Sequence, residues 1–241
     1  MEEEKNMNVE KAINILLEAL KKVDKKYLSP KNLSDDKDKL CERCFAYEFY
    51  HQWRCRLDRL NEEDGPNNPF KGLVLNGEIP KNLTQGERDK YPDMILHGGQ
   101  ENTDQEKQVL ACEIKRYSGS SNINNAAIAN DLFKLCFLTS KEFRYHGTPV
   151  PFSCGIFIFA NSDEEMMKNY IRNGLTYLKD KASAEDQIEG KSKIQIIKEN
   201  ACKVYAVAYS EEVASSESHD MPKKVRLCEI LREVLGYEIC E

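Results

Sequence analysis

The chain has 241 residues, of which 40% are hydrophobic and 32% charged, and its formal net charge is −6 at pH 7. This is ordinary globular composition, and it predicts one large α/β domain or two small ones. The acidic total excludes a global positive field that would attract nucleic acid, although basic residues can still gather locally.

The sequence predicts a cytoplasmic protein with no membrane partner. The first ten residues, MEEEKNMNVE, are acidic and polar, unlike a signal peptide. No apolar stretch approaches the roughly 18 residues of a membrane span. The nine Cys are an odd number, and several lie in apolar segments, so we expect reduced and mostly buried thiols.

Two helices are expected in the first quarter of the chain. Residues 8–23 place apolar side chains at helical spacing, with charged residues on the opposite face. Residues 39–60 predict a second, aromatic-rich helix. Its residues Phe45, Phe49 and Trp53 are spaced by four and form a core stripe.

Glu48 borders the buried face of this second helix. A carboxylate there needs a cationic partner or a metal ion, because an unpaired buried charge is strongly unfavourable. An ion pair with Arg43, Arg54 or Lys115 is the alternative to a metal. A zinc site at Cys41 and Cys44 lacks the second pair of ligands that zinc requires.

Three strands are expected next, at residues 70–79, 91–97 and 109–117. Asp93 lies near the start of the second strand. Side chains alternate along a strand, so Glu113 and Lys115 in the third strand share one face, and Ile114 points to the other. If the second and third strands form a hairpin, Asp93 lies beside Glu113.

The remaining elements alternate between helices and strands. Asp131 and Lys134 lie one turn apart in the first of these helices, which predicts a local ion pair. The apolar run at 152–160 predicts a central strand buried on both faces. The predicted elements are a helix at 125–140, a strand at 152–160, a helix at 164–178, a strand at 203–209 with a further candidate strand at 194–197, and a helix at 223–235.

The acidic residues predict a site for a hard divalent cation. Two close carboxylates repel each other and favour such an ion between them, and Mg²⁺ prefers oxygen ligands. A neighbouring lysine can place a water molecule or stabilise charge that develops on a phosphate. Pro92-Asp93 followed by Glu113-Ile114-Lys115 resembles the motif of the PD-(D/E)XK nuclease superfamily.

The resemblance implies a restriction-endonuclease-like fold, with an αβββαβ core and a mixed central sheet flanked by helices. It covers about residues 39–160 of a single domain spanning 1–241. The helix at 8–23 and the region 161–241, with its further helices, are then additions to that core. The net charge and the lack of a recognisable specificity domain depart from the pattern of many nucleases.

By the same resemblance, the chain is expected to be a metal-dependent phosphodiesterase that hydrolyses DNA. Asp93, Glu113 and the Ile114 carbonyl would hold Mg²⁺ or Mn²⁺, with Glu48 as a further ligand, and Lys115 would act on the attacking water. DNA is the expected partner, and a homodimer or a partner subunit is possible. The candidate DNA-binding cations are Arg54, Arg116 and Lys134, together with Arg56, Lys115 and Lys141.

Two other interpretations remain open on the sequence alone. The chain could be a non-catalytic module that binds nucleic acid or protein on the same scaffold. The acids could also form a structural ion-pair cluster in an unrelated α/β protein, because folds host many functions.

Overall fold

The structure, a computed structural model, describes most of the chain. It covers residues 2–28, 37–77, 92–99, 102–117, 123–145, 147–181, 187–188, 190–215 and 221–235. The predicted start of a strand at Tyr91 lies outside these residues. Among the helices within them, none has the length and apolar character needed to cross a bilayer.

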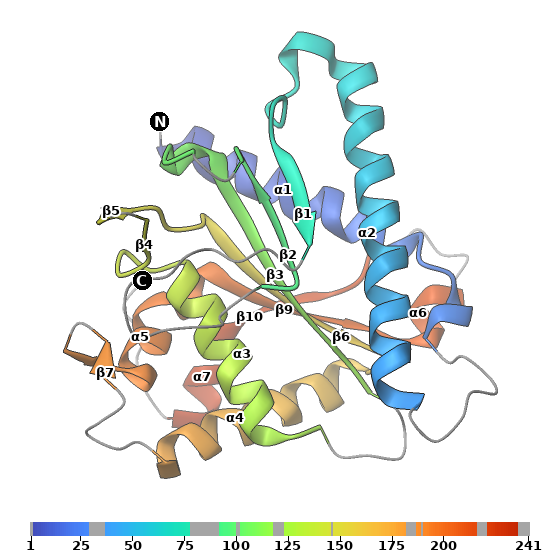
Figure 1. Ribbon diagram of the computed structural model, residues 1–241. Helices are drawn as coiled ribbons and strands as arrows, with labels where there is room; N and C mark the ends of the chain where they lie inside the picture. The colour runs from blue at the N-terminus through green and yellow to red at the C-terminus, as the bar shows by residue number, and fades with distance from the viewer. Residues whose placement is uncertain are drawn as a thin grey trace.

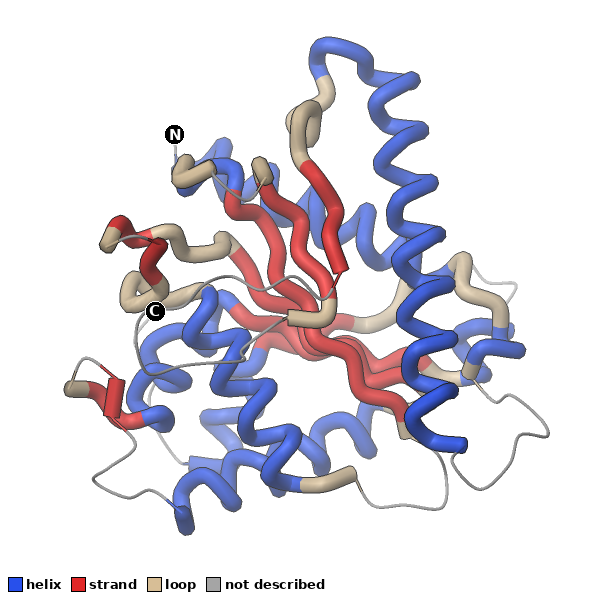
Figure 2. Tube along the Cα trace, viewed as in Figure 1, coloured by secondary structure: helices blue, strands red, loops and turns tan. Residues whose placement is uncertain are grey.

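A six-stranded sheet forms the centre of the molecule, and helices cover both of its faces (Figures 1 and 2). The α/β class predicted from the sequence is therefore confirmed. One face packs against α1 and α2, and the other packs against α3, α4, α5 and α7. The helices are α1 (Glu2–Lys21), α2 (Lys37–Asp64), α3 (Asn125–Leu138), α4 (Glu164–Lys181), α5 (Lys193–Asn200), α6 (Glu211–Ser215) and α7 (Leu227–Leu235).

The sheet is mixed, with the strand order β1-β2-β3-β6-β9-β10. The first three strands form an antiparallel meander, β3, β6 and β9 run parallel, and β10 is antiparallel to β9. The strands are β1 (Val74–Gly77), β2 (Met94–His97), β3 (Gln108–Arg116), β6 (Cys154–Ala160), β9 (Val204–Tyr209) and β10 (Lys224–Arg226). Two small hairpins lie outside the sheet, β4 (Arg144–Tyr145) with β5 (Thr148–Pro149) and β7 (Gln187–Ile188) with β8 (Lys191–Ser192).

β6 packs against both layers of helices. All seven of its residues are buried, which confirms the predicted central strand. Its side chains alternate between the two cores: Ile156 and Ile158 face α1 and α2, whereas Phe157 and Phe159 face the other helices. A parallel strand covered by helices on both faces needs such a continuous apolar run.

The aromatic stripe of α2 packs as the sequence predicts. Phe45, Phe49 and Trp53 are all fully buried against the sheet, and the rings of Phe49 and Trp53 stack with their centroids 5.6 Å apart. This stripe orients the rest of α2, so that Tyr47, one residue before Glu48, is 65% exposed.

α3 is placed by its cap and by a close contact with α4. The side chain of Asn124 accepts a hydrogen bond from the backbone N–H of Ala126, so Asn124 is the N-cap. Gly174 of α4 lets the two helices approach closely, because a Cβ there would lie 2.7 Å from Cγ2 of Ile128. α3 is therefore held firmly over β3.

Two of the expected elements are corrected. Residues 194–197 are not a strand, because they lie in α5, where Ile196 and Ile197 are both buried on one side of a helix. The predicted helix at 223–235 begins only at Leu227, because residues 224–226 form the edge strand β10. Both segments are short, and periodicity alone does not separate helix from strand at such lengths.

Candidate functional site

The hairpin of β2 and β3 brings the predicted acidic residues together. Met94 pairs with Cys112, so continuing the same register places Pro92 opposite Ile114. Proline has no N–H, and the ladder cannot continue through it. Instead, Oδ2 of Asp93 accepts a hydrogen bond from the backbone N–H of Ile114 at 2.7 Å. The predicted approach of Asp93 to the Glu113 strand is confirmed.

The end of the ladder has a consequence for the Ile114 carbonyl. The N–H and C=O of one strand residue point to the same neighbouring strand. The Ile114 carbonyl is therefore directed to the side of Asp93, where Pro92 has no N–H to donate to it. A carboxylate and a backbone carbonyl thus lie on the same side of β3, just beyond the end of β2.

Glu113 and Lys115 point from β3 towards α3, as the strand alternation predicts, and Ile114 packs in the opposite core. They form a chain of charges with two residues of α3. The ammonium of Lys134 lies 2.8 Å from Oε1 of Glu113 and 3.1 Å from Oδ1 of Asp131. The ammonium of Lys115 lies 2.9 Å from Oδ2 of Asp131. The predicted ion pair of Asp131 with Lys134 is confirmed, and it is part of a larger network.

Burial perturbs both predicted metal-binding carboxylates. Glu113 is only 1% exposed, and its burial, reinforced by the nearby Asp93 and Asp131, raises its pKa well above the usual value. Burial also raises the pKa of Asp93 to about 6, against the hydrogen bond from Ile114, which favours the charged form. Both acids hold their negative charge less readily than an exposed carboxylate.

For the two lysines, nearby charges outweigh the effect of burial on the pKa. Burial would lower the pKa of Lys115, but the charges of Asp131 and Glu42 outweigh burial and raise it. Burial likewise opposes the positive charge of Lys134, and Glu113 and Asp131 reverse that effect and raise its pKa. Both side chains are therefore cationic at neutral pH, beside acids whose own charge is disfavoured.

The carboxylate oxygens of the site are donors of the kind that a hard divalent cation takes. Oε1 of Glu113 and Oδ2 of Asp131 are buried, and within the described residues each has only its ion pair and no hydrogen bond. The same part of the chain contains no group of three or more His, Cys, Asp or Glu side chains arranged to hold a metal ion. Mg²⁺ does not need such a group, because it commonly uses one or two carboxylates and keeps several waters.

A pocket lies beside Asp93, and its described lining does not include Glu113 or Lys115. It has a volume of about 380 Å³ and is lined by Asp93 and Met94, by Asn76 and Gly77 of β1, and by residues of α2. On the α2 side, the hydroxyl of Tyr50 donates to the carbonyl of Leu75 at 3.0 Å, and the exposed ring of Tyr47 lies at the rim. Asp93 is thus reached from solvent between α2 and the end of the meander.

Glu48 does not share the described contacts of the other predicted ligands. It lies on α2, which packs on the face of β3 opposite Glu113, and its carboxylate accepts a hydrogen bond from Nε2 of Gln52 at 2.7 Å. Within the described contacts, the α2 carboxylate that reaches β3 is Glu42, whose Oε2 accepts from the N–H of Arg116 at 3.2 Å. The metal role of Glu48 stays a prediction.

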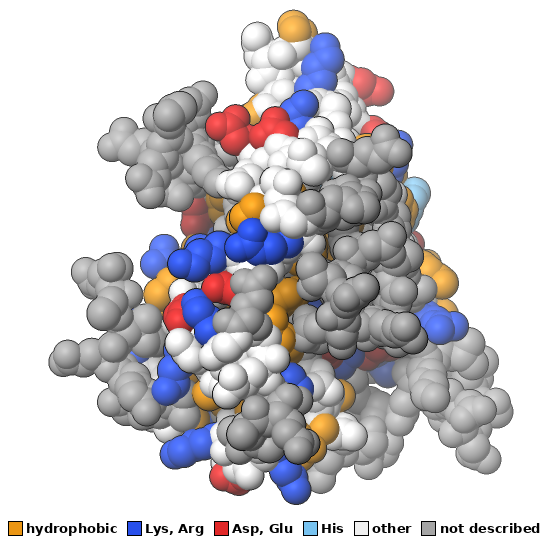
Figure 3. Space-filling model, turned by 60° about the vertical axis from the view of Figure 1, so that its left-hand side comes forward, with side chains coloured by type: hydrophobic (Ala, Val, Ile, Leu, Met, Phe, Trp, Pro, Cys, Tyr) orange, Lys and Arg blue, Asp and Glu red, His pale blue; other side chains and the backbone are white. Residues whose placement is uncertain are grey.

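The predicted substrate-binding cations have different local partners. Arg54 pairs with Asp58 at 3.3 Å on the exposed side of α2, and Arg116 donates to the carbonyl of Leu28 at 2.9 Å. Lys134 lies within the charge network described above. Figure 3 shows Lys and Arg side chains gathered on one face of the molecule, with carboxylates among them. A role in binding DNA stays a prediction for all three.

Two residues of the site went unassigned in the sequence. Asp131 was expected only to pair with Lys134, yet it also holds Lys115, because α3 crosses β3 at that point. Tyr47 lies in the same aromatic-rich helix as the buried stripe but half a turn away from it, and it is exposed. The exposure of Tyr47 could have been predicted from the sequence, because on a helix Tyr47 lies on the side opposite Phe45 and Phe49.

We compared the chain with models of protein families, with curated proteins and with solved structures, and no match was found in any of the three comparisons.

Proposed function

We propose that this protein is a metal-dependent phosphodiesterase that hydrolyses DNA with a site of the PD-(D/E)XK type. The observation that carries the proposal is the convergence of Asp93 and Glu113 at the point where Pro92 ends the β2–β3 ladder. Lys115 lies on the same face of β3 as Glu113. Two buried carboxylates with raised pKa values beside a lysine, one of them lining a pocket, are typical of a catalytic site.

The order of elements supports the same proposal. The chain order is α2, β1, β2, β3, α3 and β6, that is, helix, three strands, helix and strand, with the small β4–β5 hairpin between α3 and β6. This is the αβββαβ order of a restriction-endonuclease-like core, with Asp93 directly before the second strand and Glu113 in the third. We propose this fold assignment within the α/β class, with β9 and β10 extending the sheet beyond the core.

In this proposal Asp93, Glu113 and the Ile114 carbonyl hold Mg²⁺ or Mn²⁺. The bound ion would polarise the phosphoryl oxygen and lower the pKa of a water molecule. Lys115 orients that water or stabilises the charge developing on the phosphate. Asp131 is a positioning residue, because its carboxylate holds the ammonium of Lys115 at 2.9 Å.

The contact between Lys134 and Glu113 favours a second candidate function. The ammonium already neutralises the carboxylate, at 2.8 Å, without any metal ion. A non-catalytic module that binds nucleic acid or protein would keep such a network for structural reasons. An incoming divalent cation must displace Lys134 or share Glu113 with it, so metal binding separates the two functions.

Calorimetric titration of Mn²⁺ and Mg²⁺ is the experiment that tests the proposal. Wild type should bind Mn²⁺, and Asp93→Ala should not. Asp58→Ala is the matched control, because it removes an exposed carboxylate on α2 that pairs with Arg54. A folded wild type that binds neither ion would refute the metal site and favour the non-catalytic module.

Cleavage assays then separate metal binding from chemistry. Lys115→Met should keep Mn²⁺ binding and lose cleavage of plasmid and linear DNA by at least about 100-fold, the usual range for loss of a group that aids proton transfer or stabilises developing charge. Parallel assays with single-stranded DNA and RNA define the substrate. If Lys115→Met cleaves DNA as fast as wild type, the proposed role of Lys115 is wrong.

A further inference from the structure

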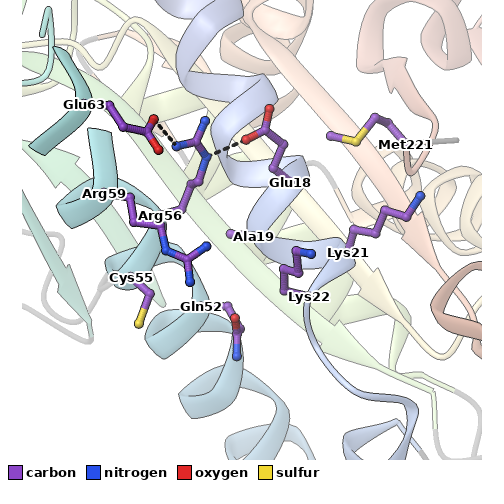
Figure 4. Close-up of a pocket in the computed structure, with 10 residues that line it drawn as sticks. All are labelled: Glu18, Ala19, Lys21, Lys22, Gln52, Cys55, Arg56, Arg59, Glu63 and Met221. Carbon is purple, nitrogen blue, oxygen red and sulfur yellow. Dashed lines mark hydrogen bonds and ion pairs between the residues drawn. The ribbon is translucent and has the colours of Figure 1, made fainter. Parts of the chain in front are cut away.

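A second hollow lies between α1 and α2, and it shares no lining residue with the pocket beside Asp93 (Figure 4). Its volume is about 460 Å³. The walls come from the C-terminal part of α1, from the second half of α2 and from Met221. A concave site of this size is in the range that holds small ligands rather than macromolecules.

The hollow is positively charged although the whole chain is acidic. Four basic and two acidic side chains line it, which gives a local net charge of +2 against −6 for the chain. The lining charges are Lys21, Lys22, Arg56 and Arg59 against Glu18 and Glu63.

Both carboxylates of the hollow are held by the same arginine. Nε of Arg56 lies 2.6 Å from Glu18, and its Nη1 lies 3.4 Å from Glu63 (Figure 4). Neither Lys22 nor Arg59 forms an ion pair with any residue that the structure describes. Within the described part of the chain, both carboxylates of the hollow are paired with Arg56, and neither pairs with Lys22 or Arg59.

The side chains of Lys22 and Arg59 approach the same space from opposite helices. Figure 4 shows the guanidinium of Arg59 and the ammonium of Lys22 extending into the gap between α1 and α2. The amide oxygen of Gln52 points into this gap, and its Nε2 points away towards Glu48, to which it donates. Ala19 and the 38% exposed Met221 supply apolar surface beside these polar groups.

We propose that this hollow binds a small phosphate monoester of about mononucleotide size. The planar guanidinium of Arg59 can donate two parallel hydrogen bonds to phosphate oxygens, and Lys22 adds a compact charge. The organic part of the ligand packs on Ala19 and Met221 and donates a hydrogen bond to the oxygen of Gln52. This site is independent of the phosphodiesterase proposed above.

The test is calorimetric titration of 5′-AMP, with inorganic phosphate and adenosine as separate probes, in EDTA so that no divalent cation takes part. AMP should bind more tightly than either probe. Arg59→Gln and Lys22→Gln should each weaken AMP binding by about tenfold or more, since a charge-assisted hydrogen bond contributes about 1.5–3 kcal/mol. Lys26→Gln is the control, because Lys26 is an exposed lysine paired with Asp24 outside the hollow.

Three results would overturn the proposal. AMP could fail to bind wild type, adenosine could bind as tightly as AMP, or both variants could keep wild-type affinity. Asp93→Ala should bind AMP normally, so the outcome does not depend on the acidic site. A DNA duplex that displaces AMP and binds more tightly through Arg59 would instead assign the hollow to a nucleic-acid backbone.

Discussion

Replacing Asp93 by Asn should stabilise the metal-free protein at neutral pH. Burial raises the pKa of Asp93 from its usual 3.8 to about 6. The folded state therefore binds a proton more tightly than the unfolded state does. The free energy of unfolding falls as the pH rises from about 3.8 through about 6, because the folded protein must give up that proton. Asn resembles the protonated acid and avoids this loss.

The magnitude follows from the two pKa values. One pKa unit corresponds to about 1.4 kcal/mol, so the difference between 3.8 and 6 amounts to about 3 kcal/mol at pH 7.5. At pH 4.5 most of the acid is already protonated in the folded state, and the same calculation leaves about 1 kcal/mol. The oxygen of Asn can still accept the hydrogen bond from Ile114, so that contact is kept.

Urea unfolding of wild type and Asp93→Asn in EDTA, at pH 7.5 and pH 4.5, measures both values. The stability difference should shrink by about 2 kcal/mol between the two pH values, because the variant no longer titrates at this position. A variant that is less stable than wild type at pH 7.5 would refute the reasoning. It would mean that Lys115 and Lys134 stabilise the ionised carboxylate more than burial disfavours it.

Three further outcomes follow from the same contacts. The affinity for Mn²⁺ should fall by at least about tenfold for each pH unit below 6, because protons compete for Asp93 and for Glu113, whose pKa is also raised. Calorimetry from pH 5 to 7.5 checks this, and a flat profile would exclude Asp93 as a ligand. Asp131→Asn should lower the free energy of unfolding by about 3–5 kcal/mol, because two buried ammonium groups lose a carboxylate that balances their charge. Urea unfolding measures this change, and a value below about 1 kcal/mol would mean that water replaces the carboxylate. Gly174→Ala should lower the free energy of unfolding by about 1–3 kcal/mol, because the added methyl group is overpacked against Ile128. An unchanged midpoint of thermal unfolding would show that α4 can shift away from α3.

The meander and the central strand could be predicted because their signals are local and strong. The alternation around Ile114 correctly separated Glu113 and Lys115 from the opposite core, and the run at 152–160, rich in β-branched and aromatic residues, favoured a strand buried on both faces. The hairpin register then followed from the positions of Asp93 and Glu113. These inferences needed neighbouring residues and no knowledge of distant contacts.

The parts of the site that depend on helix packing could not be predicted. The sequence places Asp131 and Lys134 on one side of a helix, but it does not say that this side meets Lys115. The position of Glu48 beside a buried stripe did not reveal which face of the sheet α2 would cover. The edge strand β10 was missed because three residues carry too little periodicity to be distinguished from the helix that follows.

The order of strands in the sheet has a consequence for synthesis of the chain. β6 needs β9 as a neighbour, and residues 204–209 leave the ribosome well after residues 154–160. Until then, the nascent chain presents an apolar strand with one unpaired edge, a surface that favours aggregation. A fragment that ends near residue 181 would keep this open edge permanently. We therefore expect the C-terminal region to be indispensable for solubility, even though the predicted catalytic and metal-binding residues all lie before residue 116.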